Sequence, residues 1–205
     1  MATEGGVSAR LEAIVLAAGS GSRFGGGKLL AGWRGGVVLD GALAAAFAAP
    51  VRSVTVVSGA DLRVETLARE HAVRTGQGAR LRIAHAADYA RGISASLRAG
   101  VASLPPDADG AFVFLADMPA VPPAILAPLA DALARGAAAA APTFEDRRGH
   151  PVLFARLLFE RLVALDGDEG ARMVLSDLGK ALFLLTTDDP GVLLDIDRPE
   201  DLAEA

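Results

Sequence analysis

The sequence predicts a three-layer α/β fold built on a doubly wound, mostly parallel sheet. Short apolar runs alternate with segments of helical composition along most of the 205 residues. The runs are apolar throughout and not only at alternate positions, which is typical of strands that are buried on both faces. Helices between such strands cover both faces of the sheet and make its parallel connections. Functional side chains are then expected just beyond the carboxyl ends of the strands.

Seven segments carry the strand pattern. The first, with the sequence AIVLAA, runs straight into a glycine-rich loop. The second, VTVVS, is rich in β-branched residues and ends at Gly59, and the fourth, GAFVFLA, is entirely apolar. In chain order, the predicted strands are Ala13–Ala18, Val54–Ser58, Leu81–His85, Gly110–Ala116, Gly136–Pro142, Leu182–Thr187 and Val192–Ile196.

Helical composition fills the gaps between these strands. The first helix stops before Pro50, because a proline cannot continue a helix. Asp61 is a suitable N-cap for the second helix, and the fourth has two prolines in its first turn, where a missing N–H costs little. In chain order, the predicted helices are Val38–Ala49, Asp61–His71, Ile93–Leu104, Pro122–Ala134, Phe154–Leu165, Glu169–Leu178 and Pro199–Ala203. Exposed loops are predicted at Gly76–Arg80 and Thr143–His150.

Composition excludes several classes of protein. Lys and Arg number 20 against 25 Asp and Glu, and the net charge of −5 argues against a non-specific nucleic-acid binder, which needs a basic face. The absence of Cys excludes disulfides, thiolate metal sites and cysteine nucleophiles, and His71, His85 and His150 are too scattered to predict an imidazole-rich metal site. The apolar run at 13–18 is too short for a signal core or a membrane span. We therefore expect a cytoplasmic protein without membrane or nucleic-acid partners.

The strongest local feature is the loop LAAGSGSRFGGGK at residues 16–28. Five of the nine residues from 19 to 27 are glycine, which lets backbone N–H groups approach an anion closely. Arg23 and Lys28 add positive charge to an otherwise acidic protein. A nucleoside triphosphate carries about four negative charges and suits such a loop. The position of the loop directly after a buried strand favours this interpretation over a flexible surface loop.

Two well-known phosphate-binding motifs do not fit this loop. A dinucleotide fingerprint, G-x-G-x-x-G, would need glycine where Phe24 stands. A Walker A loop would need glycine in place of Ser22 and a hydroxyl residue in place of Leu29. The sequence therefore indicates a phosphate-binding loop of another kind.

Three aspartates follow apolar runs and are candidates for a metal site. Asp117 comes after GAFVFLA and is either a Mg²⁺ ligand or a cap of the helix that starts near Pro122. Asp195 and Asp197 are separated by two positions and would share one face of a strand. Asp197 could instead cap the last helix. We favour Asp117 and Asp197 as the two ligands.

The blocks along the chain resemble those of the MobA-like nucleotidyltransferases. The first loop, LAAGSGSRFGGGKLL, is most similar to that of the molybdenum cofactor cytidylyltransferases within this group. Five further blocks follow in the order of that family and are more specific than the loop alone. They are GISASL at 92–97, LADMP at 115–119, RGHPVLF at 148–154, GDEGAR at 167–172 and DIDRPEDL at 195–202.

The resemblance implies a Rossmann-like nucleotidyltransferase fold in a single domain over 1–205. Its nucleotide-binding half would span about 10–120 and its acceptor-binding half about 121–205. The implied reaction moves CMP from CTP to the terminal phosphate of the molybdenum–molybdopterin cofactor and releases pyrophosphate with the help of Mg²⁺. An attacking phosphate is already ionised at pH 7, so such chemistry needs positioning and charge stabilisation more than a general base.

The resemblance also implies roles for individual residues. Lys28, Arg23 and Asp117 would be catalytic, and Asp117 with Asp197 would bind the metal. The acceptor would contact His150 and Arg172, with Arg148 as a further candidate. The nucleotide would contact the first loop and the residues around 58 and 92, namely Leu16, Ala17, Ala18, Gly19, Gly21, Ser22, Gly25, Gly26, Ser58, Gly92, Ser94 and Ser96.

Some of these roles have structural alternatives. The three serines outside the loop could serve in local capping or helix packing, and His150 could make a structural hydrogen bond. Ala18 stands where related guanylyltransferases usually have glycine, which resembles the branch that uses CTP.

Other functions remain compatible with the sequence. The same chemistry could use GTP or another phosphorylated acceptor, and a non-catalytic chaperone could bind the nucleotide and the cofactor without turnover. For the leading interpretation, the expected partners are CTP, a molybdopterin-type acceptor and a molybdoenzyme or its maturation chaperone.

Overall fold

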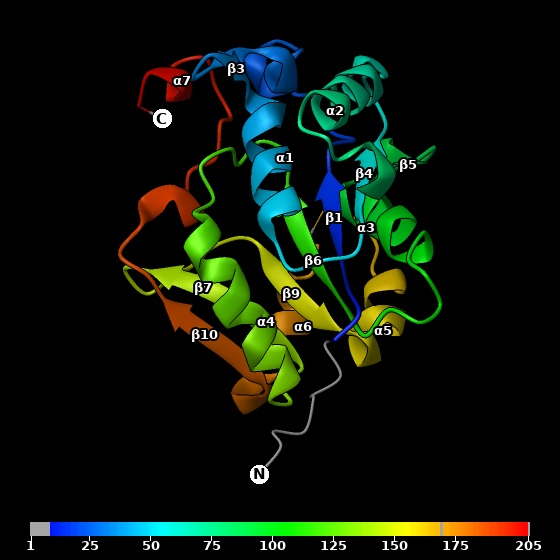
Figure 1. Ribbon diagram of the computed structural model, residues 1–205, viewed down its shortest axis with the longest axis vertical. Coiled ribbons are helices and arrows are strands. Elements are labelled where there is room, and N and C mark those ends of the chain that lie inside the picture. The colour runs from blue at the N-terminus through cyan, green and yellow to red at the C-terminus, as the bar shows by residue number, and fades with distance from the viewer. Residues whose placement is uncertain (1–8, 169, 205) are drawn as a thin grey trace.

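A mostly parallel sheet with helices on both faces forms the centre of the protein (Figure 1). The computed structural model describes residues 9–168 and 170–204. The order of strands across the sheet is β10-β7-β9-β6-β1-β4-β5, and β8 pairs with β7 at the side. This arrangement confirms the predicted fold class. The strands are β1 (Leu11–Leu16), β4 (Val54–Ser58), β5 (Leu81–His85), β6 (Gly110–Leu115), β7 (Ala139–Phe144), β8 (Arg147–Arg148), β9 (Val152–Ala155) and β10 (Leu182–Thr186).

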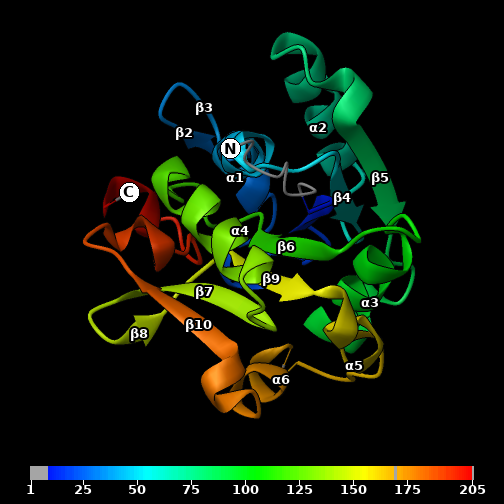
Figure 2. The same cartoon turned by 60° about the horizontal axis from the view of Figure 1, so that its bottom comes forward.

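Helices cover both faces of the sheet (Figure 2), and the sheet separates the apolar core into two layers. One layer packs under α1 (Val38–Ala48), α2 (Arg63–Arg74) and α4 (Leu126–Ala134). The other packs under α3 (Ile93–Ala102), α5 (Phe159–Val163) and α6 (Arg172–Ser176). A short helix, α7 (Asp201–Glu204), closes the described part of the chain. Within residues 9–168 and 170–204, none of the helices has the length and apolar character needed to cross a bilayer.

The order of the strands reverses next to β1. The chain passes from β1 outward to β4 and β5 and then returns across β1 to form β6 on its other side. Leu16 at the end of β1 is in register with Leu115 at the end of β6, and the N–H of Ala116 donates to Leu16 O at 3.1 Å. Ligands of doubly wound sheets bind at such a point, just outside the carboxyl ends of the strands.

The sequence prediction missed the antiparallel strand in the middle of the sheet. Val152–Ala155 forms β9 between β6 and β7 and pairs antiparallel with both. The predicted helix at 154–165 therefore begins too early, and only Phe159–Val163 is α-helical. Three of the four residues of β9 are buried, and such a short apolar run has the same composition as a buried helix turn, so periodicity does not separate them.

Near the C-terminus, the strand predicted at 192–196 was wrong. Pro190–Val192 forms a 3₁₀ turn, and the residues after it cross the ends of the strands without joining the sheet. Asp189 accepts from the N–H of Gly191 at 2.8 Å and starts this turn. Val192 and Ile196 are fully buried, but as separate anchors. Their burial produces an apolar pattern without a hydrogen-bonded ladder.

Smaller differences affect element boundaries. The strand predicted at 136–142 lies at Ala139–Phe144, and the loop predicted at 143–150 includes the short strand β8. The helix predicted at 169–178 is reduced to α6, and its expected first residue, Glu169, lies outside the described residues. A small hairpin of β2 (Gly32–Trp33) and β3 (Gly36–Val37) precedes α1 and was not predicted.

Candidate active site

The glycine-rich loop leaves the end of β1 and folds back on itself before α1. The N–H groups of Phe24 and Gly26 both donate to Gly21 O, at 3.0 and 3.1 Å. Gly21 and Gly27 have φ values of +61° and +68°, in the left-handed region that favours glycine. A side chain on Gly21 would also press against Cβ of Lys28, at 3.2 Å. The glycines therefore let the loop close tightly around Lys28.

Lys28 lies between two of the predicted metal ligands. Its Nζ is 2.7 Å from Asp117 Oδ2 and 3.0 Å from Asp197 Oδ1. Arg23 reaches the other oxygen of Asp197, with NH1 at 2.7 Å from Oδ2. Lys28 is mostly buried, whereas the Arg23 side chain is 76% exposed. Both cations that were predicted to bind phosphate are thus within reach of the carboxylates.

Asp195 completes a group of three carboxylates. One oxygen from each of Asp117, Asp195 and Asp197 lies within 4.8 Å of the others. Asp195 and Asp197 were predicted to share one face of a strand. They lie instead on the segment that crosses the strand ends. The N–H of Ile196 donates to Asp117 O at 3.0 Å and ties this segment to the end of β6.

Among the residues that the structure describes, neither Asp117 nor Asp197 takes its alternative role as a helix cap. Asp201 accepts from the N–H groups of Asp197 and Arg198, at 2.8 and 2.7 Å, and so holds the turn before α7. The carboxylate of Asp197 instead contacts Lys28 and Arg23, and that of Asp117 contacts Lys28.

The charges in this cluster shift one another's pKa values. Burial by itself lowers the pKa of Lys28, but Asp117 and Asp197 outweigh it and raise the pKa above its ordinary value. Lys28 and Arg23 in turn lower the pKa of Asp197. Asp195 keeps contact with solvent, yet the partial loss of water around its carboxylate raises the pKa to about 6, and the charge of Asp117 adds to this shift. The cluster needs a cation, and Lys28 supplies one.

The donor set fits a divalent cation of the oxygen-binding kind. Three carboxylates converge, and a positively charged ammonium group already lies between two of them. Mg²⁺ and Mn²⁺ both prefer such oxygen ligands. Asp117, Asp195 and Asp197 are therefore the residues that could hold a metal ion here.

A large cavity opens beside this cluster. Its volume is about 690 Å³, and it brings together residues from the first loop, from the start of α3 and from the end of β6. The predicted residues among its lining are Leu16, Ala18, Gly19, Ser22, Gly92, Ser96 and Asp117. Tyr89 and Asp168 also line it and were not predicted as site residues. Tyr89 comes after the third predicted strand, and Asp168 belongs to the GDEGAR block. Neither residue type by itself indicated a role in the site.

A second cavity of about 280 Å³ lies against the first. Arg148, His150 and Arg172 line it together with apolar side chains from β6, β9 and α3. The two cavities share Leu16, Ile93, Leu115 and Asp168. The residues predicted for the two substrates are therefore placed in adjoining spaces.

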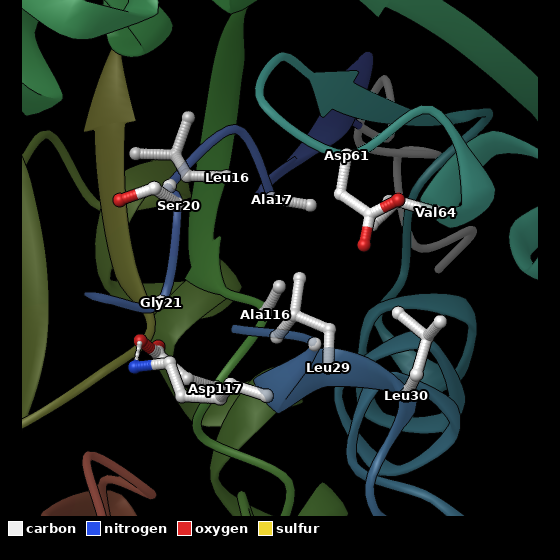
Figure 3. Close-up of a pocket in the computed structure, with 13 residues that line it drawn as sticks. Leu16, Ala17, Ser20, Gly21, Leu29, Leu30, Asp61, Val64, Ala116 and Asp117 are labelled. Carbon is white, nitrogen blue, oxygen red and sulfur yellow. Dashed lines mark hydrogen bonds and ion pairs between the residues drawn. The ribbon is translucent and has the colours of Figure 1, made fainter. Parts of the chain in front are cut away.

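A third, smaller cavity of about 90 Å³ lies under the glycine-rich loop (Figure 3). Figure 3 shows Asp61 and Asp117 at opposite sides of it, with Ala17 and Leu29 between them. Asp61 is paired with Arg63, whose NH2 is 2.7 Å from Oδ2. Ala17, which was predicted to contact the nucleotide, lines this cavity.

Two predicted serines do not present their hydroxyl groups to a cavity. Ser58 is fully buried, and its Oγ donates to Glu65 Oε1 at 2.7 Å and lies 3.1 Å from His85 Nδ1. Ser94 is also fully buried, and its Oγ has no hydrogen-bond partner in the described part of the chain. Gly25 and Gly26 lie in the exposed outer turn of the loop.

His150 lies at the wall of the second cavity, of about 280 Å³, with its ring largely enclosed. Burial lowers the pKa of His150, so the ring is neutral at pH 7. Nδ1 is buried and has no partner among the described residues. The backbone N–H of His150 donates to Val192 O at 2.9 Å, which connects the residues before β9 to the segment that carries Asp195 and Asp197. The structure thus gives His150 a structural contact through its backbone and leaves one ring nitrogen unpaired.

Comparison with known proteins places the chain in a family. A family model, the MobA-like NTP transferase domain, matches residues 13–182. The chain belongs to this family. The MobA-like resemblance of the sequence is thereby confirmed, and the protein is a nucleotidyltransferase.

Relatives of this MobA-like protein match over nearly its full length. It is 25% identical to the molybdenum cofactor cytidylyltransferase of Escherichia coli strain K12, over 95% of each chain. The crystal structure of Rv0371c from Mycobacterium tuberculosis H37Rv is 27% identical, with a TM-score of 0.77 and coverage of 97% of this chain and 98% of that one. A second structure of Rv0371c, described as a complex with manganese, is 26% identical, with a TM-score of 0.73 and coverage of 97% and 100%.

Proposed function

We propose that the protein transfers CMP from CTP to the terminal phosphate of the molybdenum–molybdopterin cofactor and releases pyrophosphate. The observation that carries this proposal is the arrangement of Lys28 and three carboxylates between a glycine-rich loop and a large cavity, which adjoins a second cavity. Such a transfer needs a cationic site for the triphosphate and a separate space for the acceptor. Similarity to a molybdenum cofactor cytidylyltransferase over 95% of the chain supports the choice of acceptor.

The triphosphate would bind at the glycine-rich loop. Its N–H groups, together with Arg23 and Lys28, offer positive charge and hydrogen-bond donors in an acidic protein. Asp117 and Asp197 would hold Mg²⁺, which would offset the negative charge that develops on the phosphates. The exposure of Arg23 leaves it free to turn from Asp197 toward a bound anion.

The nucleotide base would lie near the start of the loop. Gly59 packs close to both Ala18 and Tyr89, since a Cβ on Gly59 would lie 2.6 Å from Cβ of Ala18 and 2.9 Å from Cβ of Tyr89. Little space remains for a larger base-contacting side chain at this point. Ala18 in place of glycine supports cytosine as the base.

The acceptor would occupy the second cavity, of about 280 Å³. Arg172 and Arg148 are exposed cations that could bind its phosphate, and the unpaired ring nitrogen of His150 could accept or donate one hydrogen bond. The attacking phosphate oxygen is ionised at pH 7, so the residues need only orient it toward the α-phosphorus of CTP. The product would pass in the cytoplasm to a molybdoenzyme or its maturation chaperone.

A screen of pyrophosphate release tests this proposal. CTP, GTP, ATP and UTP are each incubated with the protein and Mg²⁺, with and without molybdenum-loaded molybdopterin. We expect release with CTP only when this acceptor is present. Release with another nucleotide or another phosphorylated acceptor would correct the substrate, whereas tight nucleotide binding without any release would indicate a chaperone.

A further inference from the structure

Asp168 lies where the two cavities of the active site meet. It lines both the cavity of about 690 Å³ beside the glycine-rich loop and the cavity of about 280 Å³ beside Arg172. It comes from the segment between α5 and α6, whereas most of the larger cavity is built by the first half of the chain. A residue at this junction can contact the nucleotide at the place where transfer occurs.

The segment that carries Asp168 is fixed to the start of α3. The N–H of Ser94 donates to Gly167 O at 3.2 Å, and Arg98 NH1 donates to Leu165 O at 3.3 Å. Gly92 has a φ of +109°, and a Cβ there would overlap the carboxylate of Asp168 and lie 2.7 Å from Gly167 O. The position of the carboxylate thus depends on the absence of a side chain at Gly92.

The charge of Asp168 is not matched by a neighbouring side chain. No hydrogen bond or ion pair to its carboxylate is made by residues 9–168 or 170–204, although Asp166 two positions earlier is 3.3 Å from Arg91 NH2. The N-terminus of α3, a helix of ten residues, supports a negative charge at this place. A carboxylate would repel the phosphates of both substrates and can only accept hydrogen bonds, so its ligand must present donors.

The position of the cavity walls indicates which donors these are. Ala18, Tyr89, Ser22 and Asp117 all line the larger cavity, and we place the base near Ala18 and the phosphates near Lys28 and Asp117. The ribose connects base and phosphates and would lie between them, in the same cavity that Gly92, Ser96 and Asp168 line. Its two adjacent hydroxyl groups match a carboxylate, as in the acidic residue that binds the ribose in dinucleotide-binding folds.

We infer that Asp168 binds the ribose hydroxyls of the nucleotide and makes the protein select ribonucleotides over deoxyribonucleotides. This inference rests on the proposed nucleotidyl transfer. It assigns a specificity-determining residue of the nucleotide site to the half of the chain that carries the acceptor cavity. The same carboxylate therefore connects occupation of the nucleotide site to the wall of the neighbouring cavity.

Calorimetric titration with deoxynucleotides tests the inference. CTP, 2′-deoxy-CTP and 3′-deoxy-CTP are titrated into the wild-type protein, Asp168→Ala and Asp168→Asn. We expect the wild type to bind CTP about tenfold more tightly than at least one deoxy analogue, as a charge-assisted hydrogen bond allows. Asp168→Ala should bind CTP about tenfold more weakly and the analogue almost unchanged, so that the ratio of the two Kd values falls close to one.

A control and a parallel assay separate the possible failures. Asp166→Asn removes a carboxylate from the same segment outside both cavities and should keep the wild-type ratio. Thermal melting and the isosteric Asp168→Asn show whether a lost affinity reflects misfolding. An unchanged ratio in both Asp168 variants, or weaker binding of molybdopterin alone, would overturn the inference while pyrophosphate release by the wild type still supports the proposed function. Failure of the wild type to bind any of the four nucleoside triphosphates would overturn both.

Discussion

The positive charge of Lys28 acts both in the folded structure and in the proposed reaction. It holds Asp117 and Asp197 together in the structure, and the proposed reaction needs its charge on the triphosphate. Because phosphoryl transfer depends on stabilising charge in the transition state, we expect Lys28→Ala to lower the turnover number at least ~100-fold, or ~2.7 kcal/mol. The measurement is the initial rate of pyrophosphate release at saturating nucleotide.

The chain offers a matched control for this variant. Lys180 is the other lysine and is exposed on the turn before β10. Lys180→Ala should turn over at the wild-type rate. Near-normal kinetics of Lys28→Ala would remove Lys28 from the mechanism, whatever its role in holding the carboxylates.

At the residue scale, the sequence predicted charged groups better than neutral ones. Lys28 follows glycines, Asp117 follows a buried strand and Asp197 follows the buried Ile196. The structure places Lys28 Nζ within 3.0 Å of both carboxylates. Ser58 is the last residue of β4, at the same edge of the sheet, but its hydroxyl contacts Glu65 and His85. A hydroxyl is easily satisfied by local partners, whereas an ion after an apolar strand needs a partner of opposite charge.

At the scale of elements, a half-buried clamp of Asp40, His71 and Arg74 joins α1 to α2. Asp40 Oδ1 is 2.6 Å from His71 Nδ1 and 2.8 Å from Arg74 NH2, and Oδ2 accepts from the N–H of Val37 at 3.1 Å. Burial by itself raises the pKa of Asp40, but the hydrogen bonds from His71 and Val37 outweigh it and lower the pKa below 3.8. The ionised carboxylate is thus more stable in the folded protein than in the unfolded one.

The clamp predicts a specific dependence of stability on pH. Because the pKa of Asp40 is lowered on folding, its contribution is present above about pH 4 and is lost as the pH falls through the folded value. We expect Asp40→Asn to lower the free energy of unfolding by about 2 kcal/mol at pH 7, since a charged acceptor is lost. Urea denaturation at pH 7 and near pH 3 measures this difference, which should shrink at the lower pH.

An exposed aspartate provides the comparison for the clamp. Asp131 on α4 is exposed, and Asp131→Asn should leave the urea midpoint unchanged at both pH values. An equal loss of stability for Asp40→Asn at pH 7 and pH 3 would show that the carboxylate acts only through its shape. The clamp would then carry no pH dependence.

Elements were predictable where an apolar run and its surroundings agree. The runs at 54–58 and 81–85 became strands with the predicted boundaries, since each lies between polar or glycine-rich segments. The runs at 152–155 and 192–196 were assigned wrongly because burial alone made them apolar. Whether a buried run becomes a strand, a helix turn or an anchored crossing depends on which neighbours offer free backbone groups, and these neighbours come from distant parts of the chain.

At the scale of the whole molecule, one sheet supports both cavities. β6 pairs with β1 on one side and with the antiparallel β9 on the other, so the loop after β1 and the residues before β9 meet above the same strand. The sequence predicted this edge of the sheet as the site, but the antiparallel strand that brings His150 and Arg148 to it was not predicted. The position of the cavity of about 280 Å³ could therefore not be derived from the parallel pattern alone.

This layout predicts that the two substrates stabilise the fold through different residues. A nucleotide at a concentration of 100 times its Kd should raise the free energy of unfolding by about 2.7 kcal/mol and the Tm by roughly 5–10 °C. Arg172 is exposed at the start of α6 and lines only the smaller of the two adjoining cavities. We expect Arg172→Ala to keep the rise in Tm with CTP and Mg²⁺ and to lose most of the rise with molybdopterin, as measured by differential scanning fluorimetry.

Arg135→Ala removes an exposed arginine at the end of α4, away from both cavities, and should keep both shifts. If Arg172→Ala lost both shifts equally, the two cavities would act as one binding site, and the division of the substrates between the two halves of the chain would be wrong.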